Sequence, residues 1–468
     1  MDDRTKILEI LNMLEYDNYP LTLKEYNVLK EDIIELYKSI YNTIINKNTI
    51  DKYFALKYVL KNSNDYITPI LTIDKNNHIT LKHKESQYDT IINTLNIPLE
   101  YKEKQEHFIY LQQISNHSQQ SKEWFELRNT MLTASVAADV LGESKYGNRT
   151  EVLLDKLGLL PNKYKENMFV HHGKKYEQIA TMIYENVYNT KIKEFGLIPY
   201  YYGNKTDISD NFLGASPDGI SSCTTLDGKM NKLLGRLLEI KCPLKRKIIN
   251  IGNVDSVICP RHYWIQVQVQ LACCNSEECD FWQCEIEEIN ESFWIANNKL
   301  MQCYSTEEQG VPLIMHDFLK RGCIIQLLPK NKSKIPKGDN CEWYSKYIYP
   351  NNLMMSLQDY MKWKNYMIDN WETLYFNYSN DYYFDKIIYW RLKSCHNVLI
   401  KRDKVWFDSK YNIFKDFWND IILYKNDTAL AEKLLKEYIN ASKKNSLNVF
   451  KKQPKSSTQI IDDFLSIS

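Results

Sequence analysis

The chain has 468 residues, which at roughly 100–200 residues per domain predicts several domains. Apolar residues make up 44% and charged residues 25%, the balance of a folded protein rather than a disordered one. The formal net charge is +1, so nucleic-acid binding would depend on a local basic surface. No apolar run is long enough to span a membrane, and the first residues lack a secretory signal. We expect an intracellular protein that is not secreted and has no membrane segment.

The eleven cysteines are too sparse for a disulfide scaffold and predict reduced thiols. Four of them cluster at Cys273, Cys274, Cys279 and Cys284, but their spacing is neither that of a zinc ribbon nor that of a ferredoxin. We expect buried structural thiols there rather than a metal site. The excess of Tyr, Asn, Ile and Lys indicates A/T-rich coding and not a function.

Four segments follow one another along the chain. Residues 1–118 predict a mainly helical domain with a hairpin at 66–82, where two β-prone runs flank a polar turn. Helical and strand patterns alternate from 119 to 330, which predicts a mixed α/β core. Residues 331–445 predict a helical, aromatic-rich extension that packs on this core, and residues 446–468 predict a flexible Lys/Ser-rich tail.

The densest chemical signal is Ser216-Pro-Asp218-Gly, followed by Leu-Glu239-Ile-Lys241-Cys-Pro. In the second segment charged and apolar residues alternate, so a β-strand places Glu239 and Lys241 on one face, roughly 6–7 Å apart at the backbone. The polar loop after Asp218 can fold that residue back beside Glu239 as a hairpin. The three side chains are therefore expected to share one small site.

Two carboxylates brought together suit Mg²⁺, which takes one or two carboxylates and otherwise keeps waters and substrate phosphates. Such a metal neutralises the developing charge of a phosphodiester and activates a water molecule, and an adjacent lysine can position or deprotonate that water. The alternative is that these charged residues form a cross-strand ion pair on a solvated sheet.

Residues 173–187 predict a helix with an apolar stripe, and Glu177 sits at the edge of that stripe. An acid there is costly unless it is paired or bound to metal. The alternative is a solvated glutamate in the first turn, favoured by the helix dipole.

Residues 262–274 carry glutamine at every second position, Gln266, Gln268 and Gln270. The segment can be an alternating strand or a helix that places Gln270 on one stripe and the other two glutamines on other faces. In either case buried glutamines need hydrogen-bond partners, which a scissile phosphate or a metal-bound water could supply.

Residues 124–142 contain Arg128, Thr133 and Ser135 and end at Gly142. Thr133 or Ser135 is expected to cap a short helix that Gly142 ends. A helix start beside an arginine suits a terminal phosphate, whereas simple capping is the alternative reading.

The basic run Lys245-Arg246-Lys247 follows directly after the charged strand. A DNA backbone could pass there, and each phosphate contact would steepen the salt dependence of binding. A solvated basic loop is the alternative. Residues 330–338 have the character of an insertion-like loop before the helical extension.

The order W-x3-R, T-A-S, G-x3-E, S-P-D-G, L-E-x-K-C-P and Q-V-Q resembles the lambda exonuclease and YqaJ-like viral recombinase nucleases of the PD-(D/E)XK superfamily. The resemblance covers about residues 121–289, under half of the chain. It implies a restriction-endonuclease-like central mixed β-sheet flanked by helices, here with helical N- and C-terminal extensions. Those extensions are typical of the versions found in large DNA viruses of eukaryotes, which implies a location in the host cytoplasm, at the viral factory, or in the nucleus.

The resemblance also implies roles for individual residues. Asp218, Glu239 and the Ile240 carbonyl would ligate Mg²⁺ or Mn²⁺, as two ions, with Glu177 in the same shell. Lys241 would orient the nucleophilic water, and Gln268 would contact that water or Lys241. A 5′-phosphate would be held by Arg128 and Ser135, with Ser216.

The implied activity is digestion of one strand of linear duplex DNA from a 5′ end, in viral recombination, repair or end processing, beside a single-strand annealing protein. Some relatives form ring-shaped trimers, an assembly that the extensions here could block. The alternatives are an endonuclease or an RNA-degrading nuclease on the same fold, and a non-catalytic nucleic-acid-binding scaffold. Residues 458–465 resemble a degenerate sliding-clamp-binding peptide, or else a tail that docks on its own domain.

Overall fold

The computed structural model describes residues 6–7, 10, 23–42, 45, 50, 70–73, 79–82, 99–115, 117–119, 121–160, 166–200, 211–296, 304–307, 311–312 and 316–451. The chain forms two compact units, residues 1–102 with 350–384, and residues 103–349 with 385–468. The tail segment 458–465 lies outside the described residues. In the described part, no helix has the length and apolar character needed to cross a bilayer.

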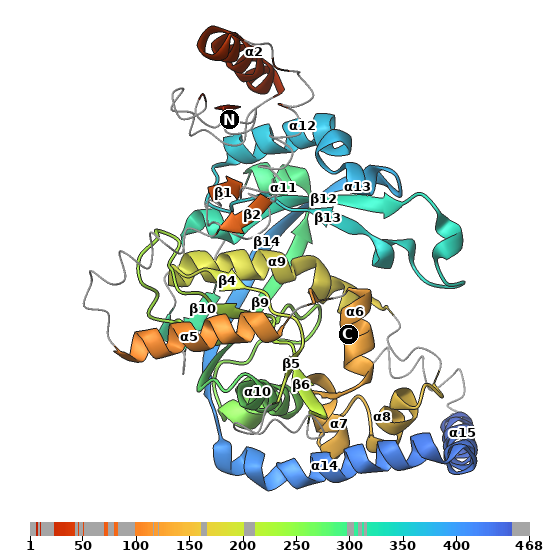
Figure 1. Ribbon diagram of the computed structural model, residues 1–468. Coiled ribbons are helices and arrows are strands. Elements are labelled where there is room, and N and C mark those ends of the chain that lie inside the picture. Colours follow the sequence, from red (N-terminus) through yellow and green to blue (C-terminus); the bar gives the residue numbers. More distant parts are fainter. Residues whose placement is uncertain are drawn as a thin grey trace. The chain divides into compact units, whose positions relative to one another are not determined.

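The described part of the first unit contains helices and a hairpin (Figure 1). Its helices are α2 (Leu23–Tyr41), α12 (Leu357–Leu374) and α13 (Phe376–Ser379). Strands β1 (Ile70–Ile73) and β2 (Ile79–Lys82) pair antiparallel, with Ile70 opposite Lys82. This pairing confirms the hairpin expected within residues 66–82.

The second unit is built on a nine-stranded mixed sheet, in which the main path runs β11-β10-β14-β9-β8-β7-β4 and β12 joins β13 and β14. Its strands are β4 (Ile192–Lys193), β7 (Gly219–Ser221), β8 (Leu237–Lys241), β9 (Glu278–Ile289), β10 (Tyr304–Glu307), β11 (Val311–Pro312), β12 (Arg321–Pro329), β13 (Lys346–Ile348) and β14 (Tyr382–Lys401). A smaller sheet has the order β3-β6-β5, from β3 (Leu132–Thr133), β5 (Ile198–Pro199) and β6 (Leu213–Ala215).

The helices of this unit include α5 (Leu99–Ile114), which begins at its edge, α6 (Lys122–Asn129), α7 (Ala137–Leu141), α8 (Arg149–Lys156), α9 (Met168–Tyr188), α10 (Arg261–Cys273), α11 (Glu291–Ala296), α14 (Lys404–Asn426) and α15 (Thr428–Lys451). Short 3₁₀ turns are η1 (Ala134–Val136), η5 (Asp317–Lys320), η6 (Lys332–Lys334) and η7 (Cys341–Tyr344), and η3 (Val254–Ile258) is a π-turn. The expected fold class, a mixed sheet flanked by helices, is confirmed.

Helix α9 lies against strands β8 and β9. It begins at Asn167, whose side chain accepts hydrogen bonds from the amides of Phe169 and Val170, and this capping stabilises the exposed amides of the first turn. Its buried stripe includes Tyr176, Ile179, Ala180, Ile183 and Tyr184. The helix starts earlier than the sequence predicted, so Glu177 lies in its interior and not in its first turn.

Strand β14 comes from the segment that was expected to be helical, and this part of the prediction is wrong. It pairs antiparallel with β9 from Tyr389, opposite Ile289, to Lys401, opposite Glu278. Helices α14 and α15 do follow it, and α14 packs on α7, α8 and α10 (Figure 1). The proposed four-part division of the chain stays a prediction, but the last strand of the core comes from beyond residue 330.

Candidate active site

A hairpin of β7 and β8 places Asp218 beside Glu239. The two strands pair antiparallel, with Gly219 opposite Leu238. A side chain at Gly219 would collide with that of Ile192 on the neighbouring strand β4, so this position requires glycine. The amide of Ile240 donates a hydrogen bond to Asp218 Oδ2 at 2.7 Å. The hairpin expected from the sequence therefore forms and fixes the Asp218 carboxylate.

Glu239 is fully buried, and both of its carboxylate oxygens have partners. The Lys241 ammonium contacts Glu239 Oε1. Gln266 Nε2 donates to Oε1 at 2.8 Å, and Gln270 Nε2 donates to Oε2 at 2.7 Å. These charge-assisted bonds offset the cost of burying the carboxylate. The expected shared face of Glu239 and Lys241 is present, and it is not a solvated one.

Lys241 also lies over the ring of Tyr263, 4.7 Å from its centroid. Burial opposes its charge, but Glu239 and Asp218 together hold the pKa of the Lys241 ammonium above its ordinary value. The side chain therefore stays protonated at neutral pH. Of the two roles open to it, this favours orienting a water molecule over removing its proton.

Glu177 reaches the same cluster from α9. Burial, with a smaller contribution from Glu239 and against the pull of Lys241, raises the pKa of Glu177 to about 7. Burial and then the charges of Glu239 and Glu177 raise the pKa of Asp218 well above its ordinary value. The charges of Glu177, Asp218 and Glu239 thus act on one another, and the mutual repulsion of these carboxylates favours a bound cation.

The residues of this cluster fit a divalent metal by their chemistry. Asp218 and Glu239 offer hard oxygen atoms, and Mg²⁺ needs only one or two protein carboxylates because waters and phosphates complete its shell. A cation would also relieve the repulsion that raises the pKa of Asp218. Within the described ranges, no three His, Cys, Asp or Glu side chains are already arranged to hold a metal ion.

Gln268 lies elsewhere, and the structure does not support its expected place beside the water or Lys241. The segment is the helix α10, in which residues two apart point to different sides. Gln268 Nε2 donates to the Lys401 carbonyl at 2.9 Å, and its Oε1 accepts from the Asp403 amide at 2.7 Å. It joins α10 to the end of β14, whereas Gln266 and Gln270, one turn apart, face Glu239.

The residues expected to hold a 5′-phosphate do come together. Arg128 Nη2 lies 3.1 Å from Ser135 Oγ and 3.4 Å from Thr133 Oγ1. The Arg128 guanidinium stacks over the ring of Trp124, 4.4 Å from its centroid. Trp124 Nε1 in turn donates to Ser216 Oγ at 3.1 Å. Ser216 precedes Asp218 by two residues, so this polar group adjoins the carboxylate cluster.

The expected capping in this segment is only partly present. Thr133 precedes the 3₁₀ turn η1, but its side chain makes no capping bond, and Ser135 lies inside η1. Gly142 ends α7 in the left-handed conformation at φ 72°, as predicted. The two hydroxyl groups accept hydrogen bonds from Arg128 instead of capping the backbone.

The residues of the basic run after β8 differ in their exposure to solvent. Arg246 points inward, where its Nη2 donates to Gln283 Oε1 on β9 at 2.8 Å. Lys245 and Lys247 are exposed, and Lys245 Nζ lies 5.7 Å from the centroid of the Phe169 ring at the start of α9. Only these two lysines of the run are available to a ligand as expected.

Sequence reasoning missed one residue that supports the site. Gln119 Nε2 donates to the carbonyls of Phe195 and Pro217, at 3.0 and 2.9 Å. The second bond fixes the residue just before Asp218. Gln119 lies in a stretch that reads as a polar linker, and nothing in its sequence context marks it. By contrast, the four-residue spacing of Gln266 and Gln270 is a helical signal that could have identified that pair.

The cysteine cluster is buried, as expected of structural thiols. Cys273, Cys274, Cys279 and Cys284 are inaccessible or nearly so, and none forms a disulfide. Burial raises the pKa of Cys274, and only Arg402 opposes that shift. Such a thiol stays protonated and unreactive at neutral pH.

Comparison with known proteins confirms the resemblance seen in the sequence. Residues 123–277 match the YqaJ-like viral recombinase domain. An uncharacterized protein of Acanthamoeba polyphaga mimivirus is 37% identical over 361 residues, which cover 76% of this chain and 61% of that protein. The chain therefore spans about three fifths of the length of this viral relative.

Among solved structures, the alkaline exonuclease LHK-Exo of Laribacter hongkongensis is 17% identical, and the alignment covers 69% of this chain and 100% of that one with a TM-score of 0.32. The same enzyme in complex with dAMP gives the same values. The family match begins in α6 and ends after α10, and so includes Arg128, Glu177 and the β7–β8 hairpin. The segment from residue 123 to residue 277 is thus similar to the YqaJ-like viral recombinase domain.

Proposed function

We propose that the protein is a metal-dependent deoxyribonuclease that digests one strand of linear duplex DNA from a 5′ end. The observation that carries this proposal is the short Ser216-Pro217-Asp218 turn. Its serine accepts a hydrogen bond from Trp124, next to Arg128, and its aspartate accepts one from the Ile240 amide, next to Glu239. A phosphate pocket and a carboxylate cluster therefore share one turn.

The residues of the site have separate roles in the proposed hydrolysis. Asp218 and Glu239 would hold Mg²⁺, with Glu177 beside them. When bound, the metal neutralises the developing charge of the phosphodiester and lowers the pKa of a water molecule. The protonated Lys241 orients the attacking water, and Gln266 and Gln270 keep the Glu239 carboxylate in place.

Arg128 and Ser135 are the basis for proposing that digestion starts at a 5′ end. An arginine that already contacts two hydroxyl groups offers several donors to a terminal phosphate. An enzyme that cuts inside a strand has no use for such a pocket. The proposed activity leaves a 3′ overhang, the substrate of a single-strand annealing protein in viral recombination or repair.

The test uses end-labelled linear duplexes that carry either a 5′-phosphate or a 5′-hydroxyl, incubated with Mg²⁺ or with EDTA. We expect cleavage that requires Mg²⁺, prefers the 5′-phosphate and disappears in the Glu239→Gln variant. Equal digestion of closed circular DNA would identify an endonuclease, and faster digestion of RNA would identify an RNA-degrading enzyme. Absence of cleavage with every substrate and metal would favour a non-catalytic scaffold.

A further inference from the structure

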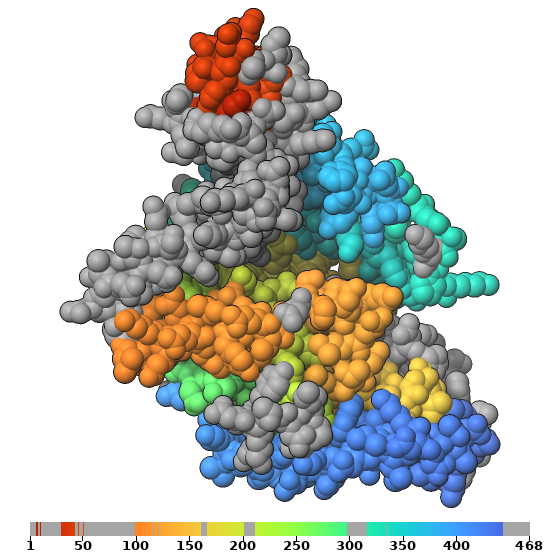
Figure 2. Space-filling view, viewed as in Figure 1, coloured from red at the N-terminus to blue at the C-terminus, as the bar shows by residue number. Residues whose placement is uncertain are grey.

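The loop between β12 and β13, here called the arm (residues 330–345), projects from the large sheet (Figures 1 and 2). Its outer part, residues 330–338, contains four lysines and no acidic or aromatic residue. Lys330, Lys332 and Lys337 are exposed. The arm therefore presents a concentrated positive charge on a chain whose net charge is only +1.

The two acidic residues of the arm lie nearer its base and are held by neighbours. Tyr344 donates its hydroxyl to Asp339 Oδ2 at 2.6 Å, and Lys386 Nζ donates to Glu342 Oε1 at 2.8 Å. The side-chain hydrogen bond from Lys386 keeps the pKa of Glu342 below its ordinary value. The two negative charges of the arm are thus bound by neighbouring side chains, whereas Lys330, Lys332 and Lys337 are exposed.

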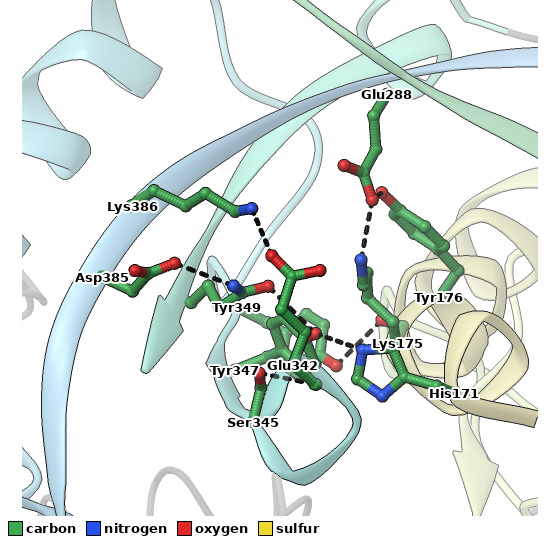
Figure 3. Close-up of polar contacts among 11 residues, drawn as sticks. His171, Lys175, Tyr176, Glu288, Glu342, Ser345, Tyr347, Tyr349, Asp385 and Lys386 are labelled. Atoms are coloured by element: carbon green, nitrogen blue, oxygen red, sulfur yellow. Dashed lines mark hydrogen bonds and ion pairs between the residues drawn. The ribbon is translucent and has the colours of Figure 1, made fainter. Parts of the chain in front are cut away.

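A hydrogen-bond network connects β12 and β13, the two strands that carry the arm, to helix α9 (Figure 3). The Tyr347 hydroxyl lies 2.8 Å from His171 Nε2 and donates to Gln326 Oε1 at 3.2 Å. Gln326, which is buried, donates from Nε2 to Asp385 Oδ2 at 2.9 Å. The two strands that carry the arm are therefore connected to α9, through Tyr347 of β13, and to β14, through Gln326 of β12.

A second connection runs through Lys175, which is buried on the same helix. Its Nζ donates to Glu288 Oε1 at 2.7 Å, and its carbonyl accepts from the Tyr349 hydroxyl at 2.9 Å (Figure 3). Glu177, the α9 residue of the carboxylate cluster, is two residues further along. Because one helix carries both the arm's anchors and an acid of the site, the arm has a defined position relative to the site.

The residue types of the outer arm indicate which kind of nucleic acid it would bind. Lysine is a flexible point charge that suits phosphate groups, and duplex DNA presents one negative charge per roughly 1.7 Å of its axis. Recognition of single strands uses aromatic side chains on which bases stack, and residues 330–338 contain none. The outer arm thus suits the backbone of a duplex better than an unpaired strand.

We propose that the arm binds the phosphate backbone of the duplex DNA whose end occupies the active site. This inference rests on the proposed function, and it names a duplex contact outside the residues matched to the family. Lys245, which is exposed and lies over the Phe169 ring at the start of α9, supplies further positive charge on that side of the helix. The contact is independent of base sequence and strengthens binding as ionic strength falls.

The test measures binding and not cleavage, with a fluorescently labelled blunt duplex in EDTA, over a series of KCl concentrations. The variant is the triple substitution Lys330→Gln, Lys332→Gln, Lys337→Gln. Its matched control removes three exposed lysines from α14 and α15, Lys404→Gln, Lys433→Gln, Lys436→Gln. Both variants change the net charge by the same amount, so a difference between them reports the location of the lysines.

We expect the arm variant to reduce the slope of log Kobs against log[KCl] by about 2–3, close to one unit for each lysine lost. The control variant should keep the wild-type slope, and Lys→Arg at the three arm positions should restore it. An unchanged slope in the arm variant, or an equal change in the control, overturns the proposal. Tighter binding of a double-stranded RNA of the same length overturns the assignment to DNA.

This binding experiment and the cleavage assay described above together separate the inference from the proposed activity. If the wild-type protein binds duplex through the arm but cleaves no substrate, the nuclease proposal fails and the arm proposal stands. If it cleaves DNA and the arm variant binds normally, only the arm proposal fails. Far-UV circular dichroism of each variant verifies that the fold is intact.

Discussion

Gln270 donates a hydrogen bond to the carboxylate oxygen of Glu239 that Lys241 leaves free, Oε2, at 2.7 Å. Because Gln266 and Lys241 both act on Oε1, the two oxygens of this buried acid have different surroundings. The amide of Gln270 thereby sets the rotation of the carboxylate about its own axis. A metal bound there would meet an oriented ligand.

The first prediction concerns this pair of residues. Gln270→Met should lower kcat by roughly ten- to a hundredfold, because a hydrogen bond to a charged group contributes about 1.5–3 kcal/mol. Gln268→Met is the matched control, since Gln268 is equally buried but binds Lys401 and Asp403. That variant should be less stable to urea yet keep its kcat per folded molecule. Equal kcat values in the two variants would contradict the assignment.

The second prediction concerns the phosphate pocket. Trp124→Phe keeps an aromatic ring beneath Arg128 but removes the donor to Ser216, and Arg128→Lys keeps the charge but loses the planar fork. Both should reduce the preference for a 5′-phosphate over a 5′-hydroxyl by about tenfold or more, chiefly through KM. Competition between the two labelled duplexes measures this ratio. A preserved ratio in Arg128→Lys would remove the pocket from the proposed mechanism.

The third prediction concerns the metal. Mg²⁺ should raise the thermal midpoint of unfolding, since a ligand present at a hundred times its Kd stabilises the folded state by about 2.7 kcal/mol. Asp218→Asn should abolish this shift and EDTA should reverse it. Asp227→Asn, in the turn between β7 and β8, removes an acid bonded to Thr225 and Asn189 and should leave the shift intact.

The fourth prediction concerns stability in acid. Burial lowers the pKa of His172 and of His396 to about 4 each, from an ordinary value of 6.5. Between pH 4 and pH 6.5, these two histidines bind more protons in the unfolded chain than in the folded one. The free energy of unfolding should therefore be highest above pH 6.5 and fall as the pH decreases toward 4, by on the order of 2–3 kcal/mol for each histidine.

Urea unfolding at several pH values measures this dependence. His396→Leu should flatten it, because His396 is fully buried and neither ring nitrogen has a hydrogen-bond partner within the described residues. His117 is exposed, so His117→Gln should leave the dependence as it is. A steep loss of stability that persists in His396→Leu and in His172→Phe would point to other groups.

The sequence predicted the parts of the site that depend on local geometry. The alternation around Glu239 is a strand pattern, and the polar loop after Asp218 can fold the chain back beside it, so the hairpin was predicted from the residues. The grouping of Arg128 and Ser135 with Ser216 came from the family resemblance, and the structure contains it. The place of Gln268 was predicted wrongly because the helix and strand readings of its segment stayed open.

Two other features depend on contacts that no local pattern contains. Polar and apolar residues alternate too weakly along β14 to predict a strand from the sequence, because much of this strand is buried on both faces of the sheet. Gln119 supports Asp218 through a hydrogen bond across 98 residues of sequence. In both cases the determinant is tertiary packing, which a reading of neighbouring residues cannot supply.

The position of β14 also governs how the protein is made. Strand β9 pairs with β8 on one edge and with residues 389–401 on the other, so its second edge stays open until most of the polypeptide has left the ribosome. Open strand edges attract other chains, and such late, distant pairing is slow. A truncated gene that ends at residue 381, after β9 but just before β14, would therefore yield aggregates, whereas one that continues to the end of α14 should give a folded product.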